Sequence, residues 1–475
     1  MTAMDSERKN HVLRIGSNFL QLGAGFVMGL LVVRLLLGLG QEAYGVIAAL
    51  TAGSGIAQLL REVIRAGLVP RLGAAWHSPH QAKEFPEVFR GALALGGIGG
   101  GLSLLAFGLV VLLLPRLDIP PALREASSLF LCWKAGQTVL ALALGPFLTS
   151  LVVQERQATY NGILMLERAI ELASACWVAS AFGVDHAAEG IVAYGRTVTL
   201  ANGMLQIAVA GWQFWRVPLS RQVPWHASRE RLRDVAGSFG WNAVQAVAMN
   251  FHLRLDMLLS NALLGLVPGL VFSLAGQAAS YVRQLAMGVV NGLDAVSARQ
   301  KSRGQGADLA VLTKSQTELA AWIVIPTAAV FWVWAEDLLR WWLGHRLNHS
   351  DDLLSLVAFQ TRVLLLGVAV RSISEPWMAI LSGAGQVKRY APLLLAGALV
   401  SPLLIVAGIA GLPAASSHWL IPGVFSAVLL MVHGVFLPGI VSKTVRLPWY
   451  SLYRPLLLPT MLSVAAVLGV WCWRA

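Results

Sequence analysis

Two arginines interrupt an apolar segment near the N-terminus in a pattern that could bind an anion. In the stretch GIAQLLREVIRAGLVPRLG, residues 55–73, Gln58, Arg61 and Arg65 recur every three or four residues. On a helix this spacing places all three side chains on one face. A guanidinium group can form two parallel hydrogen bonds with phosphate oxygens. The alternative is that both arginines only extend back to the nearest water.

A second polar face occurs at residues 269–293, where amides replace most of the charge. Gln277 and Gln284 share this face with several serines, and Arg283 lies about 80° away around the helix. Amides can hydrogen-bond the hydroxyl groups of a sugar, and Arg283 could bind an anion. The alternative is that these groups only join neighbouring helices, at about 0.6 kcal/mol per hydrogen bond.

Two further segments place polar side chains inside apolar runs. Within residues 235–263, Asn242 shares a face with His252 and Asp256, which are four residues apart and can touch. A buried carboxylate there could couple transport to an ion, or it could neutralise an arginine of another helix. Asn18 in residues 15–37 is a further candidate for binding polar cargo.

The elements that must position these residues are membrane helices. The chain has 475 residues, of which 56% are hydrophobic and 13% charged. In soluble proteins about a quarter of all residues are charged. Thirteen apolar segments are each long enough to span a bilayer: 15–37, 44–68, 90–114, 127–153, 160–182, 188–214, 235–263, 269–293, 310–335, 353–382, 391–411, 417–442 and 453–473.

The basic residues predict how these segments are oriented. Lys and Arg concentrate in alternate loops, so we expect the N-terminus and the loops 215–234 and 294–308 to be cytoplasmic. This asymmetry also explains the net charge of +12 without a nucleic-acid partner. Most of the other charges inside the apolar segments are expected to form ion pairs within the helix bundle; these charges are Lys134, Glu167, Arg168, Glu171, Arg196, Glu318, Arg362, Arg371 and Glu375.

Internal similarity divides the chain into halves. Asn18 and Gly45 of the first half match Asn242 and Gly269 of the second at a common offset. This pattern fits a transporter built from two parallel six-helix repeats. The predicted parts are an N-terminal lobe at 1–214, a cytoplasmic linker at 215–234, a C-terminal lobe at 235–442 and an extra helix at 443–475.

Small residues also carry information about packing. The run GGIGGG at residues 96–101 contains two pairs of glycines spaced by four, which predicts a close helix–helix contact. The cysteines Cys132, Cys176 and Cys472 stand singly in apolar segments, and we expect them to be buried.

Several stretches together resemble the polysaccharide flippases of the multidrug/oligosaccharidyl-lipid/polysaccharide exporter superfamily. They are SNFLQLGAGFVMGLLVVRLLLGLGQEAYGVIAAL, LLGLVPGLVFSLAGQAASYVRQLAMGVVNGLDAVSAR, RWWLG and ILSGAGQVKRY. The resemblance implies an all-α polytopic membrane protein. Its two six-helix lobes would be related by a pseudo-two-fold axis along the membrane normal, with one or two extra C-terminal helices. Such flippases have 12 or 14 spans, whereas the chain shows thirteen segments.

The resemblance also implies a cargo and a location. The cargo would be an undecaprenyl-diphosphate-linked oligosaccharide that crosses the bacterial cytoplasmic membrane by alternating access for assembly of a surface polysaccharide. Gln58, Arg61, Arg65, Gln277, Arg283, Gln284, Asn18 and Asn242 would bind this cargo. Membrane lipids and the polymerase and chain-length-control proteins of the pathway would be its partners.

Other functions stay open at this point. A peptidoglycan-precursor flippase or a drug/cation antiporter of the same superfamily would share the architecture. The chain lacks the G-x-x-x-x-G-K-[ST] motif that binds ATP phosphates, and it lacks H-E-x-x-H and a nucleophile elbow. We therefore expect no catalytic residues, no metal and no cofactor. A membrane glycan polymerase or ligase is the least favoured alternative.

Overall fold

The computed structural model describes most of the chain. The described residues are 3–51, 68, 72–73, 75–76, 78, 80–117, 119–154, 156–222, 240–290, 293–294, 297, 306–344, 351–411 and 417–474. Within these ranges the regular structure is helical and no strand occurs. Helices are expected because hydrocarbon offers the backbone no hydrogen-bond partner, so each spanning segment must bond to itself.

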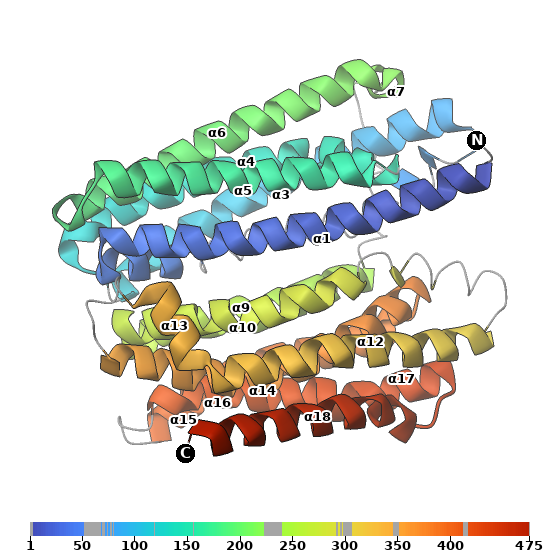
Figure 1. The fold of residues 1–475 in the computed structure, drawn as a ribbon. Helices are drawn as coiled ribbons and strands as arrows, with labels where there is room; N and C mark the ends of the chain where they lie inside the picture. The colour runs from blue at the N-terminus through green and yellow to red at the C-terminus, as the bar shows by residue number, and fades with distance from the viewer. Residues whose placement is uncertain are drawn as a thin grey trace. The chain divides into compact units, whose positions relative to one another are not determined.

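The chain divides into two compact units, residues 1–267 and residues 268–475. The helices of unit 1 are α1 (Ala3–Leu36), α3 (Gln81–Leu113), α4 (Pro121–Val153), α5 (Gln157–Ala181), α6 (Ala187–Arg216), α7 (Pro218–Arg221) and α9 (Gly240–Leu264). Short 3₁₀ turns follow α1, α3 and α5: η1 (Leu37–Leu39), η2 (Leu114–Arg116) and η3 (Val184–His186). Figure 1 shows α1, α3, α4, α5 and α6 lying side by side.

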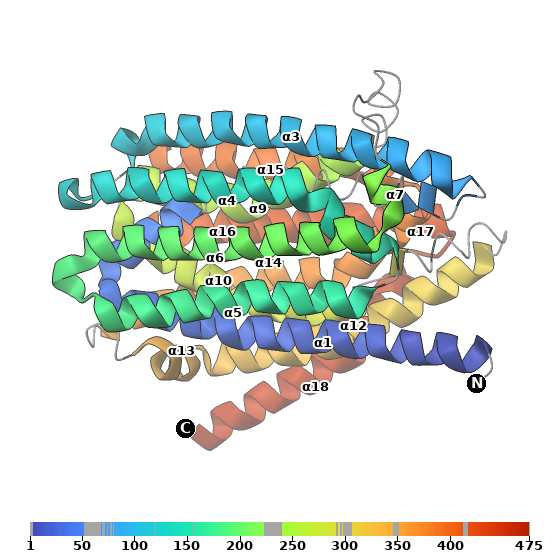
Figure 2. The ribbon, with the colours of Figure 1, turned by 90° about the horizontal axis from the view of Figure 1, so that it is seen from above.

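Unit 2 consists of a second set of long helices. They are α10 (Leu266–Val290, beginning at the unit boundary), α12 (Gly306–Val333), α13 (Ala335–Leu343), α14 (Asp351–Gly383), α15 (Val387–Gly411), α16 (Ser417–Leu429), α17 (Leu437–Val445) and α18 (Tyr450–Arg474). A π-helical turn, η5 (Leu430–Phe436), joins α16 to α17 without a break. These helices are labelled in Figures 1 and 2.

The predicted membrane spans are confirmed as helices wherever the structure describes them. Among the described residues, eight helices are long and apolar enough to cross a membrane: Gly16–Leu39, Gln81–Arg116, Pro121–Val153, Leu309–Val333, Asp351–Gly383, Val387–Gly411, Trp419–Val445 and Tyr450–Cys472. The helices α5, α6, α9 and α10 also have 25 or 30 residues but are not among these eight. The chain is therefore a multi-pass membrane protein.

The same order of helix packing occurs in both units. In unit 1, α4 packs on α3 and α6, and α6 packs on α5. In unit 2, α14 packs on α12 and α16, and α16 packs on α15. The packed pairs correspond when the predicted spans of each half are numbered from one to six. The third to sixth spans are then α3, α4, α5 and α6 in the first half, and α12, α14, α15 and α16 in the second. The repeated packing supports the internal repeat inferred from sequence, and α18, which packs on α12, is the added helix.

The chain reversals after the first helix of each predicted half are also alike. Gly40 follows η1 with φ of 106°, and Gly265 separates α9 from α10 with φ of 102°. Only glycine adopts such backbone angles without steric strain. The predicted linker at 215–234 and the lobe boundary at residue 235 stay predictions, because residues 223–239 lie outside the described ranges.

The two expectations about small residues have different outcomes. The predicted glycine contact is confirmed between α3 and α4, since a Cβ atom added at Gly96 would lie 2.4 Å from the carbonyl oxygen of Leu142. The expectation of buried cysteines is wrong, because Cys132, Cys176 and Cys472 are all exposed. In a membrane-spanning protein the outer surface meets hydrocarbon, so an apolar segment has no need to be buried in protein.

Candidate functional site

The three candidate binding residues of the first polar face lie outside the described residues. Gln58, Arg61 and Arg65 therefore stay predictions. The same holds for the side chain of His252, whose backbone lies in α9. The structure describes the remaining candidates and the charged residues that they contact, each within its own unit.

Asn18 is buried and joins two helices of unit 1. Its side-chain oxygen accepts a hydrogen bond of 2.7 Å from the amide of Asn161 on α5. The same amide donates to Ser17 at 3.0 Å. Asn18 therefore fastens α1 to α5 in this conformation, which is the contact expected of a polar side chain between membrane helices.

The candidates on α9 differ in burial. Asn242 is partly exposed, whereas Asp256 is only 1% exposed. A carboxylate at this depth is costly unless a proton, a cation or a donor compensates it. Ion coupling at Asp256 remains compatible with this position and stays a prediction.

Gln277 of α10 is held by Tyr281 of the same helix, which in turn packs against α13. The amide nitrogen of Gln277 donates to the hydroxyl of Tyr281 at 3.1 Å. The ring of Tyr281 packs edge-on against Trp342 of α13, with ring centroids 6.1 Å apart. Gln284, two turns beyond Gln277, is partly exposed. This arrangement fixes one end of the amide-bearing face of α10.

Arg283 connects α10 to the polar interior of α14. Its Nε donates to Oε1 of Glu375 at 2.9 Å. The same Oε1 atom lies 3.6 Å from Nε of Arg371, one helical turn earlier on α14. We call these three residues the Arg283–Glu375–Arg371 cluster. The side chains are 23% exposed at Arg283, 7% at Glu375 and 1% at Arg371, so the cluster extends from a partly open end into the protein.

Arg371 and Glu375 were expected to form ion pairs within the bundle, and the contact between them confirms this. The expectation is also confirmed for Arg168 with Glu171, and Arg362 pairs with Glu336 of α13. The bond between Arg283 and Glu375 was missed. These residues are 92 positions apart, and no local pattern connects them.

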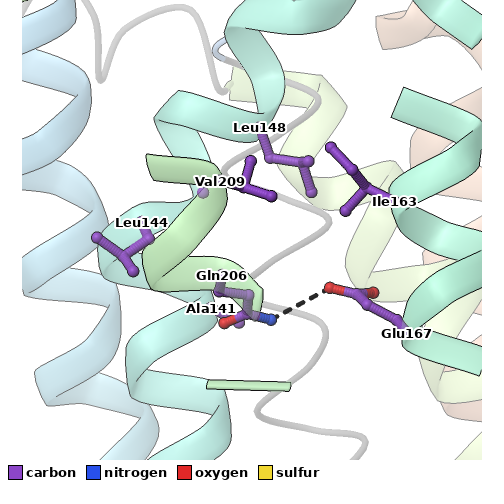
Figure 3. Close-up of a pocket in the computed structure, with 8 residues that line it drawn as sticks. Ala141, Leu144, Leu148, Ile163, Glu167, Gln206 and Val209 are labelled. Atoms are coloured by element: carbon purple, nitrogen blue, oxygen red, sulfur yellow. Dashed lines mark hydrogen bonds between the residues drawn. The ribbon is translucent and has the colours of Figure 1, made fainter. Parts of the chain in front are cut away.

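A smaller polar contact lies in unit 1 between α4, α5 and α6. The amide of Gln206 donates to Oε1 of Glu167 at 3.2 Å. Figure 3 shows this bond at the edge of a pocket lined mainly by aliphatic side chains, among them Leu144, Leu148 and Ile163. The cavity volume is about 20 Å³, which holds roughly one water molecule. It is far too small for a sugar.

A buried histidine on the π-helical turn η5 was also missed by sequence analysis. Nδ1 of His433 lies 2.7 Å from the hydroxyl of Ser374 on α14. That hydroxyl also donates to the carbonyl oxygen of Arg371 at 2.7 Å. The next residue of the turn, Gly434, accepts a hydrogen bond from Tyr453 of α18. Single π-turns of this kind occur often at functional sites.

Solved structures with the same architecture are transporters. A MOP superfamily transporter from Pyrococcus furiosus shares 12% sequence identity, with 96% of each chain covered and a TM-score of 0.68. The lipid II flippase MurJ in an inward closed conformation shares 10% identity over 97% of this chain and 92% of its own, with a TM-score of 0.69. An inward-facing MATE family multidrug transporter of the same superfamily shares 12% identity over 92% of this chain and 99% of its own, with a TM-score of 0.65.

The chain has the fold of the MOP superfamily transporters. This confirms the predicted all-helical membrane fold. No protein-family model matches the chain, and no curated protein sequence matches it. Sequence identity near one in ten shows the fold alone, so the cargo must be argued from the residues of this chain.

Proposed function

We propose that this protein flips an undecaprenyl-diphosphate-linked oligosaccharide from the cytoplasmic to the outer leaflet of a bacterial cytoplasmic membrane. The translocation proceeds by alternating access of two six-helix lobes and serves assembly of a surface polysaccharide. The N-terminus is cytoplasmic in this proposal. The polymerase and chain-length-control proteins of the pathway act on the cargo after it has crossed.

The observation that carries the proposal is the partly exposed Arg283 on the amide-bearing helix α10. Its side chain is 23% exposed although the helix has a membrane-spanning length. A cation at such a position usually faces a polar pathway, and guanidinium is the side chain best matched to phosphate oxygens. Gln277 and Gln284 on the same helix offer hydrogen-bonding groups for sugar hydroxyls.

The fold supports a transport role and leaves the charge of the cargo open. MOP-fold structures include a lipid II flippase and a multidrug transporter. For the Pyrococcus transporter, reverse polarity of the binding pocket is taken to suggest a different function. Within this fold the charged residues of each chain therefore decide between cargo classes. An arginine in the pathway favours an anionic cargo over an organic cation.

A peptidoglycan-precursor flippase is the second candidate function. The observation that favours it is the structural similarity to the lipid II flippase, with a TM-score of 0.69. Both cargoes carry a lipid-linked diphosphate, so Arg283 fits either. The distinction depends on the sugars, which the amides of α10 would contact.

The test is a flipping assay with purified full-length protein in proteoliposomes. The vesicles contain a fluorescent undecaprenyl-diphosphate-linked oligosaccharide or, in parallel, lipid II. We expect the oligosaccharide lipid to reach the opposite leaflet and Arg283→Ala to slow this transfer by about ten- to a hundredfold, as for loss of one charge-assisted contact.

The matched control is Arg362→Ala, which also removes a partly exposed arginine from an ion pair in unit 2. It should leave transfer nearly unchanged. Transfer of lipid II alone would replace the proposed cargo with the peptidoglycan precursor. Transfer of neither lipid by a well-folded protein would contradict both functions.

A further inference from the structure

The Arg283–Glu375–Arg371 cluster contains one carboxylate between two guanidinium groups. Oε1 of Glu375 lies 2.9 Å from Nε of Arg283 and 3.6 Å from Nε of Arg371. A single carboxylate oxygen thus serves both arginines. The shorter contact is made to the more exposed arginine and the longer contact to the fully buried one.

The three side chains of the cluster differ in exposure, so a ligand can reach the cluster only from the side of Arg283. A ligand that enters from the open side meets Arg283 first, because the side chains of Glu375 and Arg371 are only 7% and 1% exposed. Such a ligand finds the guanidinium already bound to an oxyanion. A carboxylate and a phosphate present oxygens in similar geometry to an arginine, so they compete for the same donors.

We propose that Glu375 is an internal substitute for the cargo phosphate. It occupies Arg283 in the empty transporter and moves onto Arg371 when a diphosphate binds Arg283. Glu375 is therefore a positioning residue that acts through Arg283. The inference rests on the proposed function for its cargo class, a lipid-linked diphosphate.

The position of Arg371 has a physical reason in this scheme. Without Glu375, Arg283 would be an uncompensated cation within a membrane helix. Without Arg371, the displaced carboxylate of Glu375 would be an uncompensated buried anion, which is strongly unfavourable. A second arginine one turn from Glu375 compensates the carboxylate in both states. Because the longer contact is already 3.6 Å, a small side-chain rotation completes the exchange.

The exchange changes which helices are connected. The Arg283–Glu375 bond joins α10 to α14, whereas the Glu375–Arg371 pair lies within α14. Cargo binding would thus remove an interhelical bond and strengthen an intrahelical one. A ligand can shift a conformational equilibrium only through contacts that differ between its states, and this exchange supplies such a difference inside unit 2.

The test measures binding of inorganic pyrophosphate to the purified full-length protein by calorimetry. Glu375→Gln removes the competing charge but keeps a side chain of the same shape. We expect it to tighten pyrophosphate binding by about ten- to a hundredfold, the effect of freeing one charge-assisted hydrogen bond. In an Arg283→Ala background, Glu375→Gln should have no such effect.

The matched control is Glu336→Gln, which removes the carboxylate of another unit 2 ion pair, 3.2 Å from Arg362. It should leave pyrophosphate affinity unchanged. Should Glu375→Gln fail to fold, Glu375→Asp serves instead, because the shorter side chain draws the carboxylate away from Arg283. It should also tighten binding, by a smaller factor.

Unchanged or weaker pyrophosphate binding by the folded Glu375 variants would overturn the proposal and leave a purely structural helix–helix ion pair. This outcome is separable from failure of the proposed function. A wild-type protein that flips the lipid-linked oligosaccharide while Glu375→Gln binds pyrophosphate no more tightly keeps its function and loses the exchange. Tighter binding by Glu375→Gln in a protein that flips no lipid supports the exchange and removes the proposed cargo.

Discussion

At the residue scale, a charged side chain in a membrane helix is best interpreted through its contacts. Arg168 and Glu171 pair at 2.6 Å within α5, and Arg362 pairs with Glu336 at 3.2 Å. These pairs compensate charge between protein groups. Arg283 differs because its partner Glu375 also contacts a second arginine. A carboxylate in contact with two arginines can exchange between them.

The first prediction at this scale concerns Arg61 and Arg65. Arg61→Ala should strongly reduce export at nearly normal protein abundance, because a charge-assisted contact to phosphate contributes about 1.5–3 kcal/mol. Arg61→Lys should restore export only partly, since an ammonium group cannot form the two parallel bonds of a guanidinium. The measurement is accumulation of lipid-linked glycan on the inner face of the membrane.

Arg65→Ala is the matched control for that prediction. On the helix predicted from sequence, Arg65 would be one turn closer than Arg61 to the cytoplasmic end, where its side chain could reach interfacial water. Its loss should have the smaller effect. Normal export by Arg61→Ala would show that both arginines only extend to the membrane surface. An equal loss of export in both variants, caused by poor membrane insertion, would also contradict phosphate binding by Arg61.

The second prediction concerns Asp256, which is 1% exposed on α9. Asp256→Asn keeps the shape of the side chain and removes its charge. If the carboxylate couples transport to an ion, the variant should reach the membrane at wild-type levels but lose its dependence on the ion gradient. Transport by reconstituted protein is measured with and without an imposed gradient. Normal gradient-dependent transport would assign Asp256 to pairing within the bundle.

At the element scale, the contact between α3 and α4 depends on glycine. A Cβ atom at Gly96 would approach the carbonyl oxygen of Leu142 to 2.4 Å, whereas one at Gly97 meets no atom within 4 Å. Gly96→Leu should therefore separate the helices, and Gly97→Leu should be accepted on the open face. Overpacking of this kind costs about 1–3 kcal/mol, which should appear as a lower Tm for Gly96→Leu in detergent. Equal Tm values for the two variants would show that the helices do not approach this closely.

The helices themselves could be predicted from sequence, and their contacts only in part. Every predicted span outside 44–68 coincides with a long helix, because about 20 apolar residues must form one in hydrocarbon. The close contact at Gly96 was also predictable, because small residues at a spacing of four mark such interfaces. The exposure of the three cysteines could not be predicted, because an apolar sequence does not distinguish a lipid-facing position from a buried one.

The candidate site shows the same limit more sharply. Pairing of Arg371 with Glu375 follows from their helical spacing, yet nothing local predicts that Arg283 joins them from 92 residues away. Asn18 was a candidate for cargo binding, and the structure shows its carbonyl engaged with Asn161 of α5. Tertiary packing decides which polar groups face each other, and a helical pattern specifies only which groups share a face.

At the scale of the whole molecule, the two units repeat one packing order. The repeat fits a transporter in which two similar bundles move relative to each other. Such a mechanism requires a defined orientation in the membrane, which the distribution of Lys and Arg predicts. The predicted position of Arg61 near the cytoplasmic side, and the side from which cargo would enter, depend on that orientation.

The last prediction tests the orientation with single cysteines. The background replaces Cys132, Cys176 and Cys472 with alanine, because all three native cysteines are exposed. Ser228→Cys and Ser302→Cys then mark the two predicted cytoplasmic loops, and Ser350→Cys marks a predicted external loop. An impermeant maleimide applied to intact cells should label only position 350, and permeabilised cells should be labelled at all three. Labelling of positions 228 and 302 in intact cells would reverse the orientation, and cargo would then meet Arg61 from the outer leaflet instead of the cytoplasmic one.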